Sequence, residues 1–156
     1  MIKNGRQYRI TKAVADRFEK SLRELTPQAS AADPLLHTAQ IDAVTSQLEE
    51  LRGQLEEYEA LSSGRISSWG FASIDDLPGA LIRARIAGGL SQKDLADQLG
   101  LKEQQIQRYE ATDYESASLA RVMEIGDALG LRLEGTTSVD ERTGSARKLF
   151  EQLPLD

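Results

Sequence analysis

Apolar side chains recur at alternating steps of three and four residues along the second quarter of the chain. The pattern covers residues 34–61, where Asp33-Pro34 supplies a capping carboxylate and a proline that needs no amide donor. Such spacing over about three heptads predicts one long helix with a coiled-coil seam. The rod must bury this seam against another helix of the chain, a second copy, or both. The seam residues, the predicted dimer or partner interface, are Ile41, Val44, Leu48, Leu51, Leu55 and Tyr58.

A shorter apolar stripe precedes the rod. Thr11 offers a capping hydroxyl to a helix over about residues 11–25, and Thr26-Pro27 ends it. The alternation in Gln7-Tyr8-Arg9-Ile10 favours a short strand before that helix. Residues 1–62 are therefore expected to form a helical hairpin for dimerisation or partner binding. The stripe consists of Val14, Phe18, Leu22 and Leu25.

The region between residues 77 and 133 carries four short helical patterns with clear stop signals. Ser91 is a good N-cap, and Gly100 stands where the chain must turn between the second and third patterns. The helices are expected at about 77–87, 92–99, 102–111 and 118–129, with a short strand at 131–133. The expected core comprises Leu81, Ile82, Ile86, Leu90, Leu95, Leu99, Leu101, Ile106, Leu119, Val122, Ile125 and Leu129.

Two segments lie outside these helical units. Residues 63–76 are expected to be a linker, and Trp69 and Phe71 within it favour docking against a neighbouring helix. Residues 134–156 are expected to be a tail with one brief amphipathic helix. Ser145 would cap that helix, and its apolar face would consist of Ala146, Leu149, Phe150 and Leu153.

Composition restricts the class of protein. The chain has no cysteine, which excludes disulfides and thiolate metal sites, and no apolar run of the roughly 18 residues that span a bilayer. It also shows no apolar signal-peptide core near its start. We therefore expect a cytoplasmic protein without a cofactor. A single histidine, His37, and the absence of a Gly-rich phosphate loop indicate that the protein is not an enzyme.

The net charge of -6 argues against a nucleic-acid partner, but the charge is unevenly distributed. Residues 1–30 contain seven basic and three acidic side chains, whereas residues 31–60 contain one basic and seven acidic ones. Residues 77–133 are nearly neutral, with seven basic and eight acidic side chains. A basic face would therefore have to arise from the fold.

The stretch from Leu90 to Glu110 indicates two short helices around a tight turn. The residues typical of such a helix pair are Leu90-Ser91-Gln92, Leu95-Ala96, Gly100, Ile106 and Tyr109-Glu110, followed further along by Ala128-Leu129-Gly130. On these residues, the region 77–133 resembles the Xre/Cro family of helix-turn-helix DNA-binding domains, found in phage repressors, plasmid regulators and bacterial antitoxins. The resemblance implies an all-α chain in which a lambda-repressor-like domain follows the hairpin.

The resemblance also implies which residues meet DNA. Gln92 would hydrogen-bond a phosphate and set the orientation on the duplex. The third helix would enter the major groove, where Gln104 is suited to adenine and Arg108 to guanine. The full predicted set is Gln92, Lys93, Lys102, Glu103, Gln104, Gln105 and Arg108.

Arg85 and Glu110 are expected, from the same resemblance, to form a partly buried ion pair between the first and third helices. The chain departs from the family at Lys102, where a Ser or Thr cap is common, and in the acidic loop 111–115. The loop composition weakens the phosphate contacts made there in the family. The basic residues of the N-terminus are candidates to replace them: Lys3, Arg6, Arg9 and Lys12.

Two functions fit this sequence. The first is a dimeric, sequence-specific transcription regulator that binds double-stranded operator DNA, represses its own operon and, by analogy with Xre-type antitoxins, neutralises a toxin protein. The second is a protein-interaction adaptor or scaffold that uses the hairpin and binds no DNA. The amide-rich face of residues 102–108 favours the first function, and the acidic composition favours the second.

Overall fold

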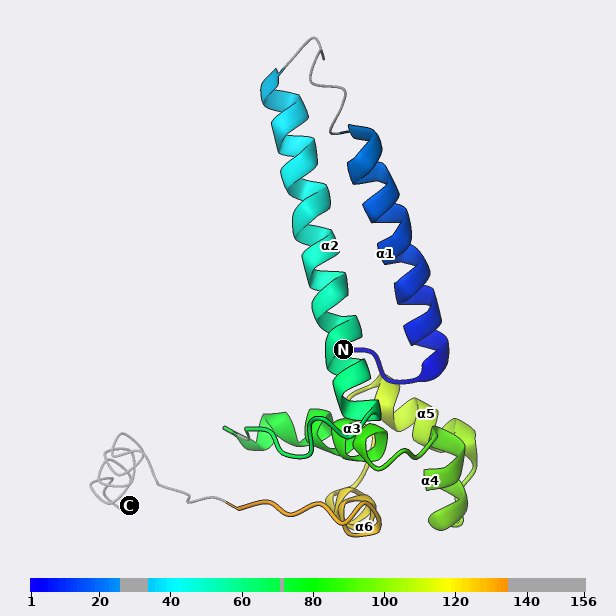
Figure 1. The fold of residues 1–156 in the computed structure, drawn as a ribbon. Helices are drawn as coiled ribbons and strands as arrows, with labels where there is room; N and C mark the ends of the chain where they lie inside the picture. The colour runs from blue at the N-terminus through cyan, green and yellow to red at the C-terminus, as the bar shows by residue number, and fades with distance from the viewer. Residues whose placement is uncertain (26–33, 71, 135–156) are drawn as a thin grey trace, which may run out of the picture.

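A computed structural model describes residues 1–25, 34–70 and 72–134 of the chain. Over these residues every regular element is helical, which confirms the predicted all-α fold. The elements are α1 (Gly5–Leu25), α2 (Pro34–Ser62), the short 3-10 helix η2 (Ile74–Asp76), α3 (Leu77–Ala87), α4 (Gln92–Gln98), α5 (Glu103–Ala111) and α6 (Leu119–Ala128). Figure 1 shows α1 and α2 as a long antiparallel hairpin that stands on the cluster formed by the shorter helices.

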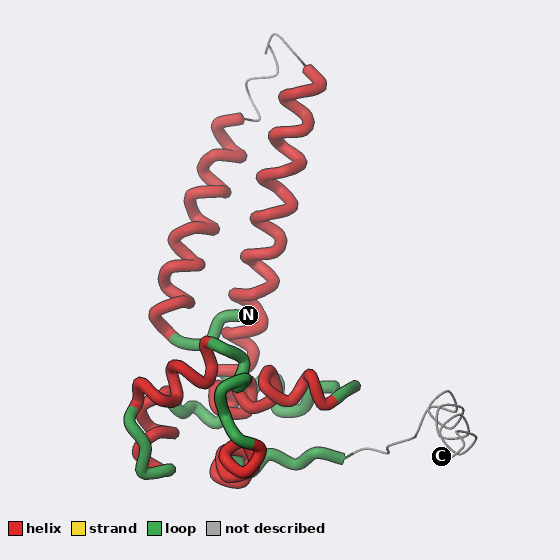
Figure 2. The backbone as a smooth tube through the Cα atoms, turned by 180° about the vertical axis from the view of Figure 1, so that it is seen from behind, coloured by secondary structure: helices red, strands yellow, loops and turns green. Residues whose placement is uncertain are grey.

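The hairpin buries its own seam within one chain. α1 lies along α2 in both views (Figures 1 and 2), Ala15 of α1 is 4% exposed, and Leu48 of α2 is 2% exposed. The other predicted interface residues, Ile41, Val44, Leu51, Leu55 and Tyr58, are half-buried in the isolated chain. Of the partners that the seam pattern left open, the structure therefore supplies α1 of the same chain.

The first helix starts earlier than predicted, and the strand predicted at residues 7–10 is wrong. Asn4 caps the helix, because its side-chain Oδ1 accepts a hydrogen bond from the Gln7 amide at 3.0 Å. Tyr8 then stacks on Tyr58 of α2, with ring centroids 5.2 Å apart. The capped turn and the contact with α2 outweigh the local alternation, and Thr11 lies inside the helix instead of at its start.

The short helices enclose one apolar core. Leu95, Ile106 and Ile125 are 0% exposed and Leu81 is 1% exposed, as the apolar spacing predicts. Ser91 caps α4, as expected, through a hydrogen bond accepted from the Asp94 amide. Gly100 has a φ of +65°, the left-handed conformation that the turn into α5 requires and that glycine adopts without strain.

Two expectations about this region differ from the structure, and two of its core residues were not expected. Leu119 was expected in the core but is 67% exposed, because it lies at the first residue of α6 and at the edge of its apolar stripe. Tyr114 and Leu61 are core residues that the spacing did not indicate. Residues 131–134 have no regular structure, so the short strand predicted there is wrong; no neighbouring strand exists among the described residues to pair with it.

The hairpin is joined to the helix-turn-helix core by the last turn of α2. Leu61 is 1% exposed and belongs to the same apolar cluster as Leu81, while Trp69 packs against this cluster from the linker, as expected. An ion pair joins Arg83 Nε of α3 to Glu57 Oε1 of α2 at 2.8 Å. Phe71 and the predicted tail helix with its face Ala146, Leu149, Phe150 and Leu153 lie outside the described residues. In the described part, no helix combines the length and apolar character needed to cross a membrane.

Candidate nucleic-acid interface

α5 presents a polar face to solvent while its other side is held in the core. Ile106 is fully buried and anchors the helix. Gln104 and Arg108 are exposed, and their side chains have no hydrogen-bond or ion-pair partner among the described residues. Because they are four residues apart, they lie on the same helical face. Lys102, which directly precedes α5, is likewise exposed and has no side-chain partner within the described ranges.

The side chains of Glu103 and Gln105, two other predicted DNA contacts, each accept a hydrogen bond from α5 or from the residue before it. Gln107 Nε2 donates a hydrogen bond to Glu103 Oε1 at 2.8 Å. The Lys102 amide donates to Gln105 Oε1 at 3.1 Å, so the Gln105 side chain helps to cap its own helix. All these side chains are exposed, and such surface contacts contribute little free energy, so they can open when a better partner arrives.

The start of α4 carries fixed charges beside this face. Hydrogen bonds from the Ser91 hydroxyl and amide lower the pKa of Asp94 below its ordinary value of 3.8. The carboxylate of Asp97 lies 2.8 Å from Lys93 Nζ and raises the pKa of that lysine. Lys93 is therefore a permanent cation at neutral pH, exposed at the start of α4 and paired only with a surface carboxylate.

A buried polar network joins α3, α4 and α5. Arg85 Nε and Nη2 donate to Glu110 Oε1 and Oε2 at 2.6 and 2.8 Å, which is the expected ion pair in bidentate form. Both side chains are almost fully buried, at 3% and 0% exposed. Arg85 also donates to the carbonyl oxygens of Leu90 and Lys3. Gln92 Nε2 adds a third hydrogen bond to Glu110, at 2.8 Å.

Gln92, the residue expected to bind a phosphate, belongs to this buried network in the free chain. The residue is 8% exposed. Its Nε2 donates to Glu110, and its Oε1 accepts from Asn4 Nδ2 at 3.4 Å. Because the buried Glu110 carboxylate attracts the amide N–H, the side chain points into the protein. In this conformation one of the two Nε2 hydrogens is used by Glu110, and the other is the donor that remains for a phosphate.

The N-terminal segment completes this network, which the sequence analysis did not foresee. Lys3 Nζ donates to the Glu110 carbonyl oxygen and forms an ion pair with Asp113 Oδ1 at 2.9 Å. Ile2 is 3% exposed, so the segment is also held by apolar packing. These contacts join residues more than a hundred positions apart, and no local pattern predicts them. Only the cap at Asn4 had a readable signal, an Asn three residues before Gln7.

The loop after α5 is held in an unusual backbone conformation. Asp113 and Tyr114 have φ values of 45° and 61°, in the left-handed region that residues with a Cβ adopt rarely. Tyr114 is 4% exposed and stacks on Tyr109, with centroids 6.1 Å apart. Burial of the ring raises the pKa of its phenol, which stays neutral. The packing of Tyr114 against the core supplies the free energy that stabilises this turn and so defines the end of α5.

Comparison with known proteins agrees with this geometry. Residues 81–135 match a family described as Helix-turn-helix. This part of the chain is a helix-turn-helix domain. The match begins within α3, includes α4, α5 and α6, and supports a DNA-binding transcription regulator. No curated protein and no solved structure matches the chain.

The exposed side chains of α5 are the candidate contacts of the helix-turn-helix domain. The described residues contain no group of three His, Cys, Asp or Glu placed to hold a metal ion. The exposed side chains of α5 include the amide of Gln104 and the guanidinium of Arg108, and Lys102 directly precedes the helix. Amides and guanidinium groups form the bidentate hydrogen bonds that distinguish base pairs in the major groove.

Proposed function

We propose that the chain is a sequence-specific transcription regulator whose α5 reads operator DNA in the major groove. The proposal is carried by one observation: Gln104 and Arg108 are exposed, have no partner within the described part of the chain, and share one face of a helix whose other side is anchored by Ile106. A side chain without an internal partner loses no hydrogen bond when it meets a base. Gln104 is suited to the N6 and N7 atoms of adenine, and Arg108 to the O6 and N7 atoms of guanine.

A selection from random duplex DNA tests this proposal. The parent is expected to enrich one sequence, and its affinity should fall steeply as salt rises. Gln104→Ala and Arg108→Ala should each reduce discrimination at one base position by about 5- to 150-fold, the value of one bidentate contact. Fluorescence anisotropy with operator and single-base variants measures this ratio.

Two matched controls come from the hairpin. Gln47→Ala and Arg17→Ala remove the same functional groups from exposed positions of α2 and α1, and both should leave discrimination unchanged. If the parent selects no sequence, or if the α5 variants discriminate as the parent does, α5 is not the reading helix.

We further propose that two chains bind one operator. Half-sites about 34–36 Å apart would place two α5 helices on one face of the duplex. The hairpin seam is already covered by α1, whereas Leu119 and Met123 of α6 are 67% and 61% exposed, which favours contact through the helix-turn-helix unit. Light scattering with operator should give two chains per duplex; a single chain per duplex would contradict the dimer.

A role as an autorepressing antitoxin is the finer form of this proposal. It is supported by the long hairpin, in which α1 and α2 offer protein-binding surface away from α5 (Figure 1). Co-expression with the product of an adjoining reading frame tests it: relief of growth arrest supports the antitoxin role, and an innocuous neighbour product opposes it. An adaptor that binds protein alone is the alternative, favoured by the net charge of -6. It predicts no salt-dependent selection of DNA.

A further inference from the structure

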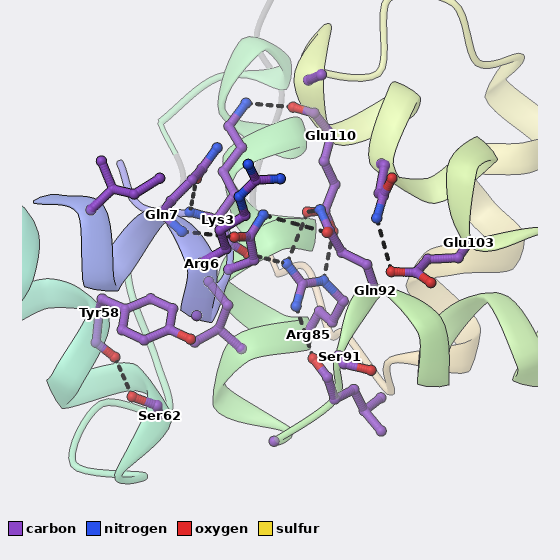
Figure 3. A pocket seen from close by; sticks show the side chains of 18 residues that line it. Lys3, Arg6, Gln7, Tyr58, Ser62, Arg85, Ser91, Gln92, Glu103 and Glu110 are labelled. Carbon is purple, nitrogen blue, oxygen red and sulfur yellow. Dashed lines mark hydrogen bonds and ion pairs between the residues drawn. The ribbon is translucent and has the colours of Figure 1, made fainter.

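A cleft lies between the start of α1 and the helix-turn-helix unit (Figure 3). Arg6 and Gln7 of α1 line one side, Ser91 and Gln92 line it from the start of α4, and Gln107 lines it from α5. Glu103 also lines it from α5, whereas Gln104 and Arg108 do not, so the cleft adjoins the face that is proposed to enter the major groove without including it. Arg6 of the hairpin and Gln107 of α5 thus line the same cleft.

Among the basic side chains of this cleft, Arg6 alone is free in the described structure. Arg85 is bound to Glu110, and Lys3 is bound to Asp113 and to the Glu110 carbonyl oxygen. Arg6 is exposed and has no hydrogen-bond or ion-pair partner among the described residues. Because Arg85 is paired with Glu110, Arg6 carries the one guanidinium of the cleft that has no partner among the described residues.

The other basic residues of the N-terminus are placed less well. Lys12 Nζ lies 5.9 Å from the centroid of the Tyr8 ring and interacts with its π face. Arg9 is exposed but does not line the cleft. Of the four N-terminal cations, Arg6 is therefore the one that combines a free side chain with a position beside α4 and α5.

We infer that Arg6 binds a backbone phosphate of the DNA strand that borders the groove occupied by α5. This inference rests on the proposed function. When the second helix of the turn lies in the major groove, the first crosses the sugar–phosphate backbone. The start of α4 shares the cleft with Arg6, so that backbone passes over the guanidinium. A guanidinium can donate two parallel hydrogen bonds to a phosphate.

The segment that carries Arg6 is already fixed in place. The Lys3 carbonyl oxygen accepts a hydrogen bond from Arg85 at 2.6 Å, and Asn4 caps α1 two residues before Arg6. A residue held on a rigid element loses less conformational entropy on binding than one on a free arm. The hairpin thereby becomes part of the DNA-binding surface, and Arg6 supplies a phosphate contact from outside the helix-turn-helix unit.

The test is the salt dependence of binding by Arg6→Gln, with Arg17→Gln as the matched control on the same helix. Arg6→Gln should weaken binding to operator and to random duplex alike, by about five- to tenfold, and reduce the slope of log K against log salt by about 1. Arg6→Lys should keep most of the slope because it keeps the charge. Circular dichroism should give one melting temperature for all four proteins, since Arg6 is exposed and has no hydrogen-bond or ion-pair partner among the described residues.

The outcomes separate this inference from the proposed function. If the parent binds no DNA, the proposed function fails. If the parent binds and Arg6→Gln has the affinity and the slope of Arg17→Gln, the phosphate contact is wrong while α5 can still read DNA. If Arg6→Gln weakens only the operator and not random duplex, Arg6 contacts a base, which also overturns the inference.

Discussion

Replacing Glu110 with glutamine is expected to lower the free energy of unfolding by about 3–5 kcal/mol. The Glu110 side chain is 0% exposed and accepts hydrogen bonds from two nitrogens of Arg85 and from Gln92. Glutamine keeps the shape but has one acceptor oxygen and an NH2 group that would face donors. The Arg85 guanidinium would then be buried without a counter-charge. Urea unfolding followed by circular dichroism measures the loss.

A neighbouring acid provides the control for this variant. Glu115 is exposed in the loop after α5, and Glu115→Gln should change the free energy of unfolding by less than about 0.5 kcal/mol. The double variant Arg85→Met with Glu110→Met should lose less stability than the two single changes summed, since it leaves no uncompensated charge. If Glu110→Gln is as stable as Glu115→Gln, the ion pair is not buried in solution.

Leu61→Ala is expected to destabilise the helix-turn-helix core although Leu61 lies at the end of the hairpin. Leu61 is 1% exposed and belongs to the cluster that includes Leu81. Removing a buried leucine side chain beyond its Cβ costs about 2–5 kcal/mol, because transfer free energy is lost and a cavity remains. Trp69 is the only tryptophan and packs against this cluster, so its fluorescence reports the unfolding of the core.

Leu35→Ala is the matched control for the same side-chain deletion in α2. Leu35 is 79% exposed, so the change should shift the Trp69 transition by less than about 0.5 kcal/mol. If Leu61→Ala unfolds at the same position as Leu35→Ala, α2 and the helix-turn-helix core are not one packed unit. The expected shift would instead show that the hairpin cannot be removed at Ser62 without damage to the domain.

Local signals in the sequence were sufficient for most helices. The predicted 77–87 helix has the observed bounds of α3, and the long helix predicted over 34–61 is α2, Pro34–Ser62. Apolar spacing and caps act within a few residues, so they can be read without the fold. The same locality explains the error at residues 7–10, where four alternating residues fit a strand or a helix equally well. The Asn4 cap and the stacking of Tyr8 on Tyr58 decided for the helix.

By itself, the sequence determined the all-α architecture, the turn at Gly100 and the residue types on the exposed face of α5, because each depends on neighbours along the chain. The tertiary structure alone decided which helix covers the seam of α2, that Gln92 donates to the buried Glu110, and that Arg6 shares a cleft with the start of α4. These outcomes depend on contacts between residues far apart in the chain. A pattern can require that a side chain be buried or paired, but only packing in three dimensions selects its partner.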